Sequence, residues 1–379
     1  MRCTALALVL VSSLWCCQQV SKKESATSSD WAFPYFEKVD SLNPILKPAP
    51  ELEFRDPITG QLVKWEERNV LNPTALVKDD KVYLLYRAQD QYGTSRIGLA
   101  ISEDGLHFEK NPEPIFYPDQ DSMKVYEWNQ QKAADWPSNA ADCHNCYFDG
   151  VEDPRVVQSE AGDYIMTYTA YDGKTARLCL ASSKDLKNWV KHGPVLSEAA
   201  YRDIWSKSGA IVGRLRGNQI IAEKINGKYW MYFGDTQLFM AQSEDLIHWQ
   251  VALNEESGKP IAVLNPRPGY FDSRLVEPGP YALLREEGIL LIYNASNAAN
   301  YSDPQLPRFT YAAGQALFDG STPYKLLERT DSYFIHPDKD YEKVGEVNEV
   351  CFVEGLVFFK GKWLLYYGTA DSKIAVAQY

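Results

Sequence analysis

One short pattern occurs five times in this chain: a charged or glycine residue at a turn, then an apolar run with an aromatic residue at the sixth position. The five aromatic residues are Tyr86, Tyr168, Phe233, Tyr293 and Tyr367. They are separated by 82, 65, 60 and 74 residues. A repeat of this length means that one supersecondary unit is copied several times.

Each copy follows a turn, and a second β-prone run precedes that turn, so each copy predicts a β-hairpin. Three copies continue into a third apolar strand with a shared ending: Ile97–Phe108, Leu178–Trp189 and Leu238–Trp249. Long apolar helical periodicity is absent, which argues against an α/β fold. Antiparallel units of this size could stack as a solenoid, but their length and variable loops favour blades. We therefore predict an all-β fold, a five-bladed β-propeller with a central active-site channel, closed by residues of about 40–70.

The N-terminus has the composition of a targeting segment. Arg2 precedes a short apolar stretch that ends at Cys16 and Cys17, and a polar run rich in Ser and Lys follows. This arrangement resembles a bacterial lipoprotein signal, with plain secretion as the alternative. The predicted organisation is a signal peptide over 1–17, a flexible tether over 18–40 and a single catalytic domain over 41–379. The protein is expected to be exported, in the periplasm or attached to the outer membrane only through a lipid anchor.

Composition narrows the classes of partner. The net charge is −12 and no basic cluster occurs, so nucleic acid is not expected as a partner. Aromatic residues make up 13% of the chain, which suits β-strands and also the binding of sugars. Cys143 and Cys146 lack a second ligand pair, which favours a local disulfide or two free thiols over zinc. We expect neither a metal nor a cofactor.

Polar residues lie at similar distances before the repeated aromatic residues. In a propeller, the inner strands of all blades meet at the channel, so these residues are expected to lie together. An acid or amide beside proline is also typical of a simple turn, which is the alternative for any one of them. The set consists of Asn72 before Tyr86, Asp153 before Tyr168, Glu277 before Tyr293, Asn348 and Glu349 before Tyr367, and Glu223 before Phe233.

Converging carboxylates suit glycoside chemistry, in which one acid protonates the leaving oxygen and a carboxylate activates water. The segment Gly150–Arg155 resembles the acid-bearing motif of glycoside hydrolase family 130. Further motifs similar to those of the family occur between Asn72 and the C-terminal stretch 366–371. The resemblance implies a five-bladed propeller that acts on β-mannosides. It also implies that Asp153 is the general acid, acting through a substrate hydroxyl. The residues expected to hold the mannose are Asn72, Arg87, Arg155 and Asp371.

The family contains hydrolases and phosphorylases, and this chain departs from the phosphorylase pattern. Phosphorylases typically carry Tyr-His where this chain has Tyr293 and Asn294, and they lack the acids present here as Glu223 and Glu277. Acids beside the nucleophile would repel phosphate but activate water. We predict Asp153, Glu223 and Glu277 as catalytic residues, with Lys207, Tyr293 and Asn294 as further substrate-binding residues.

The predicted function is an inverting, exo-acting glycoside hydrolase that cleaves β-mannosidic bonds, with β-1,2 linkages favoured, in manno-oligosaccharides or glycans. Because Arg155, Lys207 and Arg274 could bind an anion, a β-mannoside phosphorylase that releases mannose 1-phosphate stays open. A non-catalytic surface glycan-binding lipoprotein is the second alternative. Some loops are expected to set the length of the substrate. Their aromatic residues either stack on further sugar units or pack against the rest of the protein: Trp128, Trp136 and Tyr301.

Overall fold

Strands dominate the structure, a computed structural model that describes residues 30–135, 148–202 and 205–379. Residues 31–379 form one compact unit. The predicted signal peptide, the Cys143–Cys146 pair and Trp136 lie outside the described residues. The helices of the described part are short: α1 (Lys124–Glu127), α2 (Gln130–Asp135) and α3 (Asp340–Lys343). None of them has the length and apolar character needed to cross a membrane.

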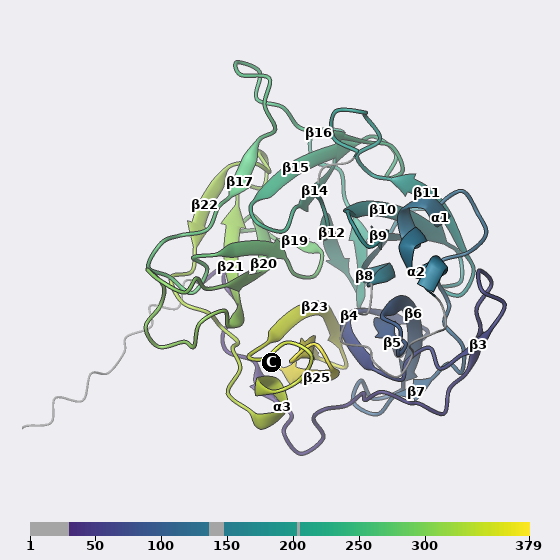
Figure 1. Ribbon diagram of the computed structural model, residues 1–379. Helices are drawn as coiled ribbons and strands as arrows, with labels where there is room; N and C mark the ends of the chain where they lie inside the picture. The colour runs from purple at the N-terminus through teal and green to yellow at the C-terminus, as the bar shows by residue number, and fades with distance from the viewer. Residues whose placement is uncertain (1–29, 136–147, 203–204) are drawn as a thin grey trace, which may run out of the picture. The chain divides into compact units, whose positions relative to one another are not determined.

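The strands of the described residues form five antiparallel groups, each built mainly from strands that follow one another along the chain (Figure 1). The first group contains β4 (Asn69–Lys78), β5 (Lys81–Gln89), β6 (Thr94–Ser102) and β7 (Glu109–Lys110). The second contains β8 (Asp149–Gln158), β9 (Tyr164–Tyr171), β10 (Ala176–Ser183) and β11 (Trp189–Pro194). The third contains β12 (Gly209–Arg216), β14 (Tyr229–Phe233), β15 (Leu238–Ser243), β16 (Trp249–Val251) and β17 (Ala262–Leu264).

The fourth group begins with two short strands, β18 (Leu275–Pro278) and β19 (Ala282–Leu284), which both pair with β20 (Ile289–Ser296). It continues with β21 (Tyr311–Phe318) and β22 (Leu326–Arg329). The fifth contains β23 (Cys351–Phe359), β24 (Lys362–Thr369), β25 (Lys373–Gln378) and β1 (Glu37–Lys38). The remaining strands are β2 (Phe54–Arg55), β3 (Leu62–Val63) and β13 (Gln219–Ala222), which forms an antiparallel hairpin with the end of β12.

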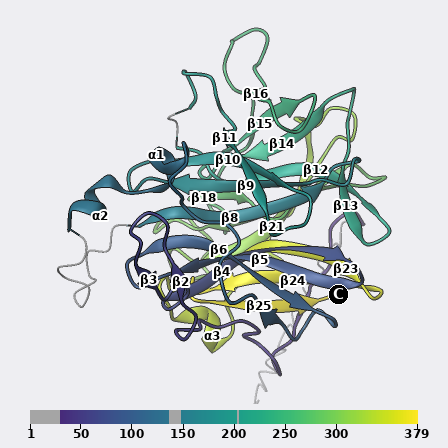
Figure 2. The same cartoon turned by 90° about the vertical axis from the view of Figure 1, so that its right-hand side faces the viewer.

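The first strand of each group lies near a common centre, where β4, β8, β12, β19 and β23 are seen in Figure 1. Contacts join β23 to β4, β4 to β8, β8 to β12 and β12 to β19. The first group therefore lies between the second and the fifth (Figure 2). Because neighbouring groups cover both faces of the middle strands, these strands are mostly apolar, and all eight residues of β20 are buried.

The N-terminal strand completes the fifth group, and this corrects the predicted tether. Glu37 and Lys38 pair with Gln378 and Ala377 of β25. Trp31, Phe33 and Phe36 are buried in the core, so residues 31–40 belong to the folded unit rather than to a tether over 18–40. The polar composition typical of a tether ends at Asp30, and apolar side chains begin directly after it. The N-terminal segment therefore starts to pair with the fifth group at Glu37, before the predicted residues 40–70. Within that predicted range, Leu46 also pairs with Ile374.

Four of the five repeated aromatic residues share one hydrogen-bonding arrangement. Each is a buried tyrosine whose hydroxyl donates to a carboxylate: Tyr86 to Glu66 at 2.8 Å, Tyr168 to Glu127 at 2.8 Å, Tyr293 to Asp272 at 2.9 Å and Tyr367 to Glu342 at 2.9 Å. Each carboxylate also pairs with a cation on the fourth strand of its group: Lys110, Lys191, Arg329 and Lys38 respectively. The third group has Phe233 instead and lacks the hydroxyl.

These Tyr–carboxylate–cation units explain why the pattern is so regular. A buried hydroxyl needs a partner, and a buried carboxylate needs both a hydrogen bond and a positive charge. Each unit joins the second strand of a group to its fourth strand through a side chain from the segment outside the group. The tyrosine of the repeat thus links the strands of its group through a carboxylate and a cation. In the fifth group β1 supplies the cation, Lys38, whereas the other three groups use their own fourth strand.

Candidate active site

Backbone irregularities bring three polar side chains to the centre. The ladder shifts register between Leu71 and Pro73 in β4, between Glu152 and Arg155 in β8, and between Val353 and Gly355 in β23. Asn72 and Asp153 lie within these shifts with φ of 48° and 50°, and Glu354 occupies the third. A bulge of this kind re-aims a side chain that regular alternation would place on a sheet face.

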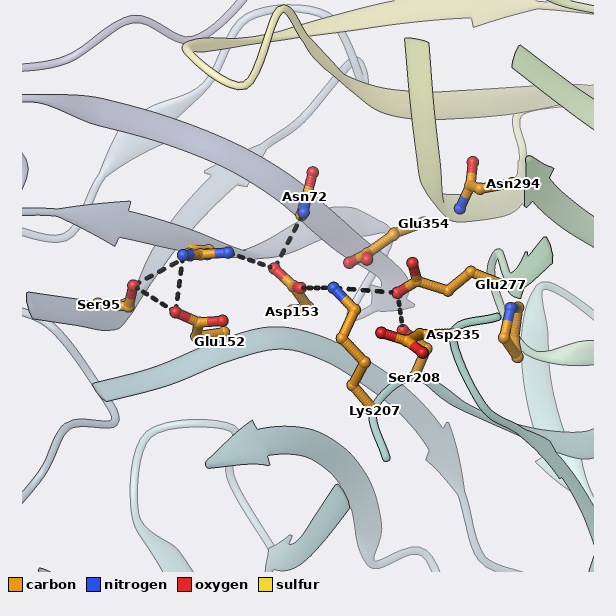
Figure 3. A network of polar contacts seen from close by, with 12 residues as sticks. Asn72, Ser95, Glu152, Asp153, Lys207, Ser208, Asp235, Glu277, Asn294 and Glu354 are labelled. Carbon is orange, nitrogen blue, oxygen red and sulfur yellow. Dashed lines mark hydrogen bonds and ion pairs between the residues drawn. The ribbon is translucent and has the colours of Figure 1, made fainter. Parts of the chain in front are cut away.

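The carboxylate of Asp153 is contacted by three side chains from different parts of the sequence (Figure 3). Asn72 Nδ2 donates to its Oδ1 at 2.9 Å, Arg87 Nη1 lies 3.3 Å from Oδ1, and Lys207 Nζ lies 3.5 Å from Oδ2. Burial alone would raise the pKa of Asp153, but Arg87, Lys207 and Asn72 outweigh it and hold that pKa below its usual range. Asp153 is therefore ionised in the free protein.

Glu277 lies on the other side of Lys207, whose Nζ is 3.3 Å from Oε1 of Glu277. Ser208 Oγ also donates to this oxygen. Burial raises the pKa of Glu277 despite Lys207 and Arg155. Because Lys207 contacts both carboxylates, the facing oxygens of Asp153 and Glu277 lie at most about 7 Å apart, the sum of the two distances. The structure thus brings these two predicted catalytic residues together.

Arg87 connects Asp153 to a second acid, Glu152. Its Nη2 lies 2.7 Å from Glu152 Oε1, and Ser95 Oγ donates to the same oxygen at 3.1 Å. Burial raises the pKa of Glu152 to about 7 against the effect of Arg87. Asp371, in the turn between β24 and β25, is close enough to Arg87 to interact electrostatically, and burial raises its pKa to about 6.

Arg155 is fully engaged by the protein. Its Nη2 donates to Glu354 Oε1 at 2.8 Å and to Pro278 O at 2.8 Å, and its Nε donates to Gly279 O at 2.6 Å. Burial raises the pKa of Glu354 well above its usual range, although Arg155 opposes this. Arg155 therefore joins β8, β18 and β23 around the centre, and its donors are not directed to open space.

Two predicted substrate-binding residues have structural partners instead. Successive side chains on a strand point to opposite faces, so Tyr293 and Asn294 cannot both face the centre. Tyr293 donates to Asp272 in the tyrosine unit described above. Asn294 Nδ2 donates to Val353 O at 2.9 Å, and its Oδ1 accepts from Val353 N at 2.8 Å. Asn294 thus ties β20 to β23 beside the cluster.

Glu223 is not brought into the cluster. Its carboxylate pairs with Arg214 at 3.0 Å and Arg216 at 3.1 Å, and its backbone N–H donates to Val212 O. Val212 is four residues along β12 from Ser208, about 13 Å at the usual rise per residue. The expectation that Glu223 shares the depth of Asp153 is therefore wrong, because the β13 hairpin is inserted between the inner strand and Phe233.

The cluster contains more acids than cations. Its carboxyl groups are the buried Glu152, Asp153, Glu277 and Glu354 and the half-buried Asp371, and its cations are Arg87, Arg155 and Lys207. Of the predicted residues, Asn72, Arg87, Asp153, Arg155, Lys207, Glu277 and Asp371 all belong to this part of the structure. Sequence reasoning missed Glu152, Ser208 and Glu354. Glu354 did carry a signal, since it interrupts an apolar run 13 residues before Tyr367.

This arrangement, antiparallel sheets around a centre lined by paired acids, is typical of enzymes that act on glycosidic bonds. The chain belongs to glycoside hydrolase family 130: the family profile, described as beta-1,4-mannooligosaccharide phosphorylase, matches residues 44–379. Members of this family act on mannosides as glycosidases or as phosphorylases, and the protein is an enzyme of this kind.

Relatives of both kinds are similar to this chain. A 1,2-beta-oligomannan phosphorylase from Thermoanaerobacter sp. is 29% identical, over 88% of this chain and 94% of the relative. The structure of a putative glycosidase from Bacteroides thetaiotaomicron is 42% identical with a TM-score of 0.84, covering 92% of this chain and 98% of that one.

A second solved structure has 40% identity and a TM-score of 0.84, covering 92% of this chain and 95% of that one. It was reported with the statement that the GH130 family of mannoside phosphorylases contains glycoside hydrolases that target beta-1,2 mannosidic linkages in Candida mannan. Family membership alone thus leaves two reactions, hydrolysis and phosphorolysis.

Proposed function

We propose that the protein is an inverting, exo-acting β-mannosidase with a five-bladed propeller fold, whose five antiparallel groups are the blades. The preferred bonds are β-1,2 linkages of manno-oligosaccharides or glycans. The similarity to the structure reported with β-1,2-mannoside hydrolases supports this linkage. Asp153 and Glu277 are at most 3% exposed, which suits the end of a sugar chain better than its middle.

The observation that carries hydrolysis over phosphorolysis is that each cation of the cluster is already paired with a carboxyl group of the protein. Arg155 is paired with Glu354, Arg87 with Glu152 and Asp153, and Lys207 with Asp153 and Glu277. A phosphate dianion needs positive charge and free donors, whereas here each cation already contacts at least one carboxyl group of the protein. A neutral water molecule has no such cost, and a carboxylate can accept its proton.

In the proposed mechanism, Asp153 and Glu277 form the acid–base pair. Following the family resemblance, Asp153 delivers the proton through a substrate hydroxyl, and Glu277 deprotonates water on the opposite face of the sugar. In the free protein the pKa of Asp153 is lowered and that of Glu277 is raised, so substrate binding has to reverse this order. A sugar hydroxyl that displaces Lys207 from Asp153 would act in that direction. The upper limit of about 7 Å between their oxygens includes the short end of the range of inverting enzymes, about 6.5–9.5 Å, and also the separation of about 5–5.5 Å in retaining enzymes, so the anomer of the product decides between them.

The test is to incubate the enzyme with β-1,2- and β-1,4-linked manno-oligosaccharides, with and without phosphate, and to follow the products by NMR. We expect mannose, first released as the α-anomer, at a rate independent of phosphate. Mannose 1-phosphate formed only with phosphate would refute hydrolysis. First release of the β-anomer would refute inversion.

Phosphorolysis is the second candidate function, because the phosphorylase from Thermoanaerobacter covers nearly the whole chain and Lys207 lies between the two acids. A non-catalytic glycan binder is distinguished by Asp153→Asn, which would leave such a protein unchanged. We further propose export with a lipid anchor at Cys17, supported by the sequence of residues 1–30. Loss of membrane association in Cys17→Ser cells is the expected result.

A further inference from the structure

A half-exposed tryptophan lies beside the acid cluster. Trp205 is 49% exposed, although a large apolar ring would ordinarily be covered by the protein. It precedes Lys207 by two residues, and the backbone oxygen of Lys207 accepts a hydrogen bond from Gly234 N at 3.1 Å. Trp205 and the turn between β14 and β15 are therefore held next to the Lys207 that contacts Asp153 and Glu277.

The orientation of this ring is held on two sides. Trp205 Nε1 donates to Asp235 Oδ2 at 2.5 Å, and the ring meets Tyr171 edge-on with 6.0 Å between centroids. A ring held in this way has already lost its rotational freedom, so a ligand that packs on it pays little additional ordering entropy. Figure 3 shows Asp235 beside Ser208 and Glu277, which places this support at the edge of the cluster.

Trp205 also lines a pocket of about 440 Å³. Its other walls include Phe239 and the polar side chains of Asp235, Thr236 and Gln237. A pyranose has an apolar face of C–H groups and a rim of hydroxyls, so it needs one flat aromatic surface and several hydrogen-bonding groups. The pocket offers both, and its volume falls within the usual range for small-molecule sites.

We propose that Trp205 is the stacking platform for a second sugar unit, the one next to the unit held at the cleaved bond. The inference rests on the proposed function, since it takes mannosides as substrates, but it does not depend on whether water or phosphate attacks. The first unit occupies the space at Asp153 and Glu277, and the neighbouring pocket receives the next ring. Asp235 has two tasks here: it holds the indole and accepts a hydroxyl of the sugar.

Substrates of different length test this directly. For Trp205→Ala, we expect kcat/KM on β-1,2-mannobiose and mannotriose to fall about 10-fold, mainly through KM, equivalent to about 1.4 kcal/mol. On β-mannosyl fluoride, which has one sugar unit, the same variant stays within about twofold of wild type. Trp205→Phe keeps a flat ring and recovers most of the loss.

The matched control is Tyr324→Ala, which removes a ring of similar exposure, 44%, that packs on Trp230 away from the pocket. We expect this variant to be unchanged on all substrates. Equal losses of Trp205→Ala on the fluoride and on mannotriose, or no loss on either, would overturn the proposal. Mannose 1-phosphate from the wild type would refute hydrolysis while leaving the length comparison for Trp205 intact.

Discussion

Replacing Lys207 with methionine tests the electrostatic core of the proposed mechanism. The ammonium group lies 3.5 Å from Asp153 and 3.3 Å from Glu277, and its side chain is 20% exposed. At such distances a charge pair contributes about 5 kcal/mol with an effective dielectric constant of about 20, equivalent to about 3.5 pKa units. Arg87 and Arg155 remain and solvent screens part of the effect, so we expect a rise of about 1–2 units for both acids.

The sign of the effect on activity follows from this rise. A cation favours the ionised form of a neighbouring carboxyl, so its removal raises both pKa values. The limbs of kcat/KM report the free enzyme, in which the pKa of Asp153 is the lower one and that of Glu277 the higher one, so the acidic limb follows Asp153 and the basic limb follows Glu277. Both limbs should therefore move to higher pH by about 1–2 units in Lys207→Met.

The assay is the pH dependence of kcat/KM on mannobiose, with thermal unfolding measured at each pH to exclude loss of the fold. Lys207→Arg serves as the control, because it keeps the charge and should leave both limbs within about half a unit of wild type. A Lys207→Met profile that only needs vertical scaling to match wild type would refute the reasoning, since Lys207 would then not control the ionisation of either acid.

Three further changes test the site and the repeat. Glu277→Gln should lower kcat/KM about 10³-fold, whereas Glu223→Gln should stay within about threefold because Glu223 pairs with arginines outside the cluster; equal losses would contradict this placement. Tyr168→Phe should cost about 1–2 kcal/mol of unfolding free energy in urea denaturation, and an unchanged midpoint would mean that the tyrosine units do not stabilise the fold. Gly98→Ala should cost about 1–3 kcal/mol, since a Cβ would lie 2.5 Å from the Tyr86 ring; wild-type stability would show that the ring moves freely.

Much of the architecture could be predicted because the tyrosine units force one residue type to recur at one position. Counting back from these residues located Asn72, Asp153 and Glu277, which the structure places at or beside the centre. The same count failed where an inserted hairpin changes the number of residues between the polar residue of the inner strand and the repeated aromatic residue. In the third group, the β13 hairpin lengthens the interval, so Ser208 rather than Glu223 reaches the cluster.

Other errors arose because a one-dimensional pattern does not show which way a side chain points. The pattern predicts Asn348 and Glu349, which have a turn-like composition, rather than Glu354, which lies inside an apolar run. A bulge in β23 makes Glu354 the residue beside Arg155, and a bulge leaves only a weak trace in composition. Tyr293 and Asn294 have suitable chemistry, but their partners are Asp272 and Val353.

The pairing of β1 with β25 has a consequence for the order in which the molecule folds. Glu37 and Gln378 are partners separated by more than 300 residues, so this contact cannot form until nearly all of the intervening chain has been synthesised. During translation, the first strand to leave the ribosome must therefore wait unpaired while the other groups form. Glu342 and Tyr367 likewise lack the charge of Lys38 until that moment. Contacts of such sequence separation are slow to form, and we expect the pairing of β1 with β25 to be the slowest step of folding.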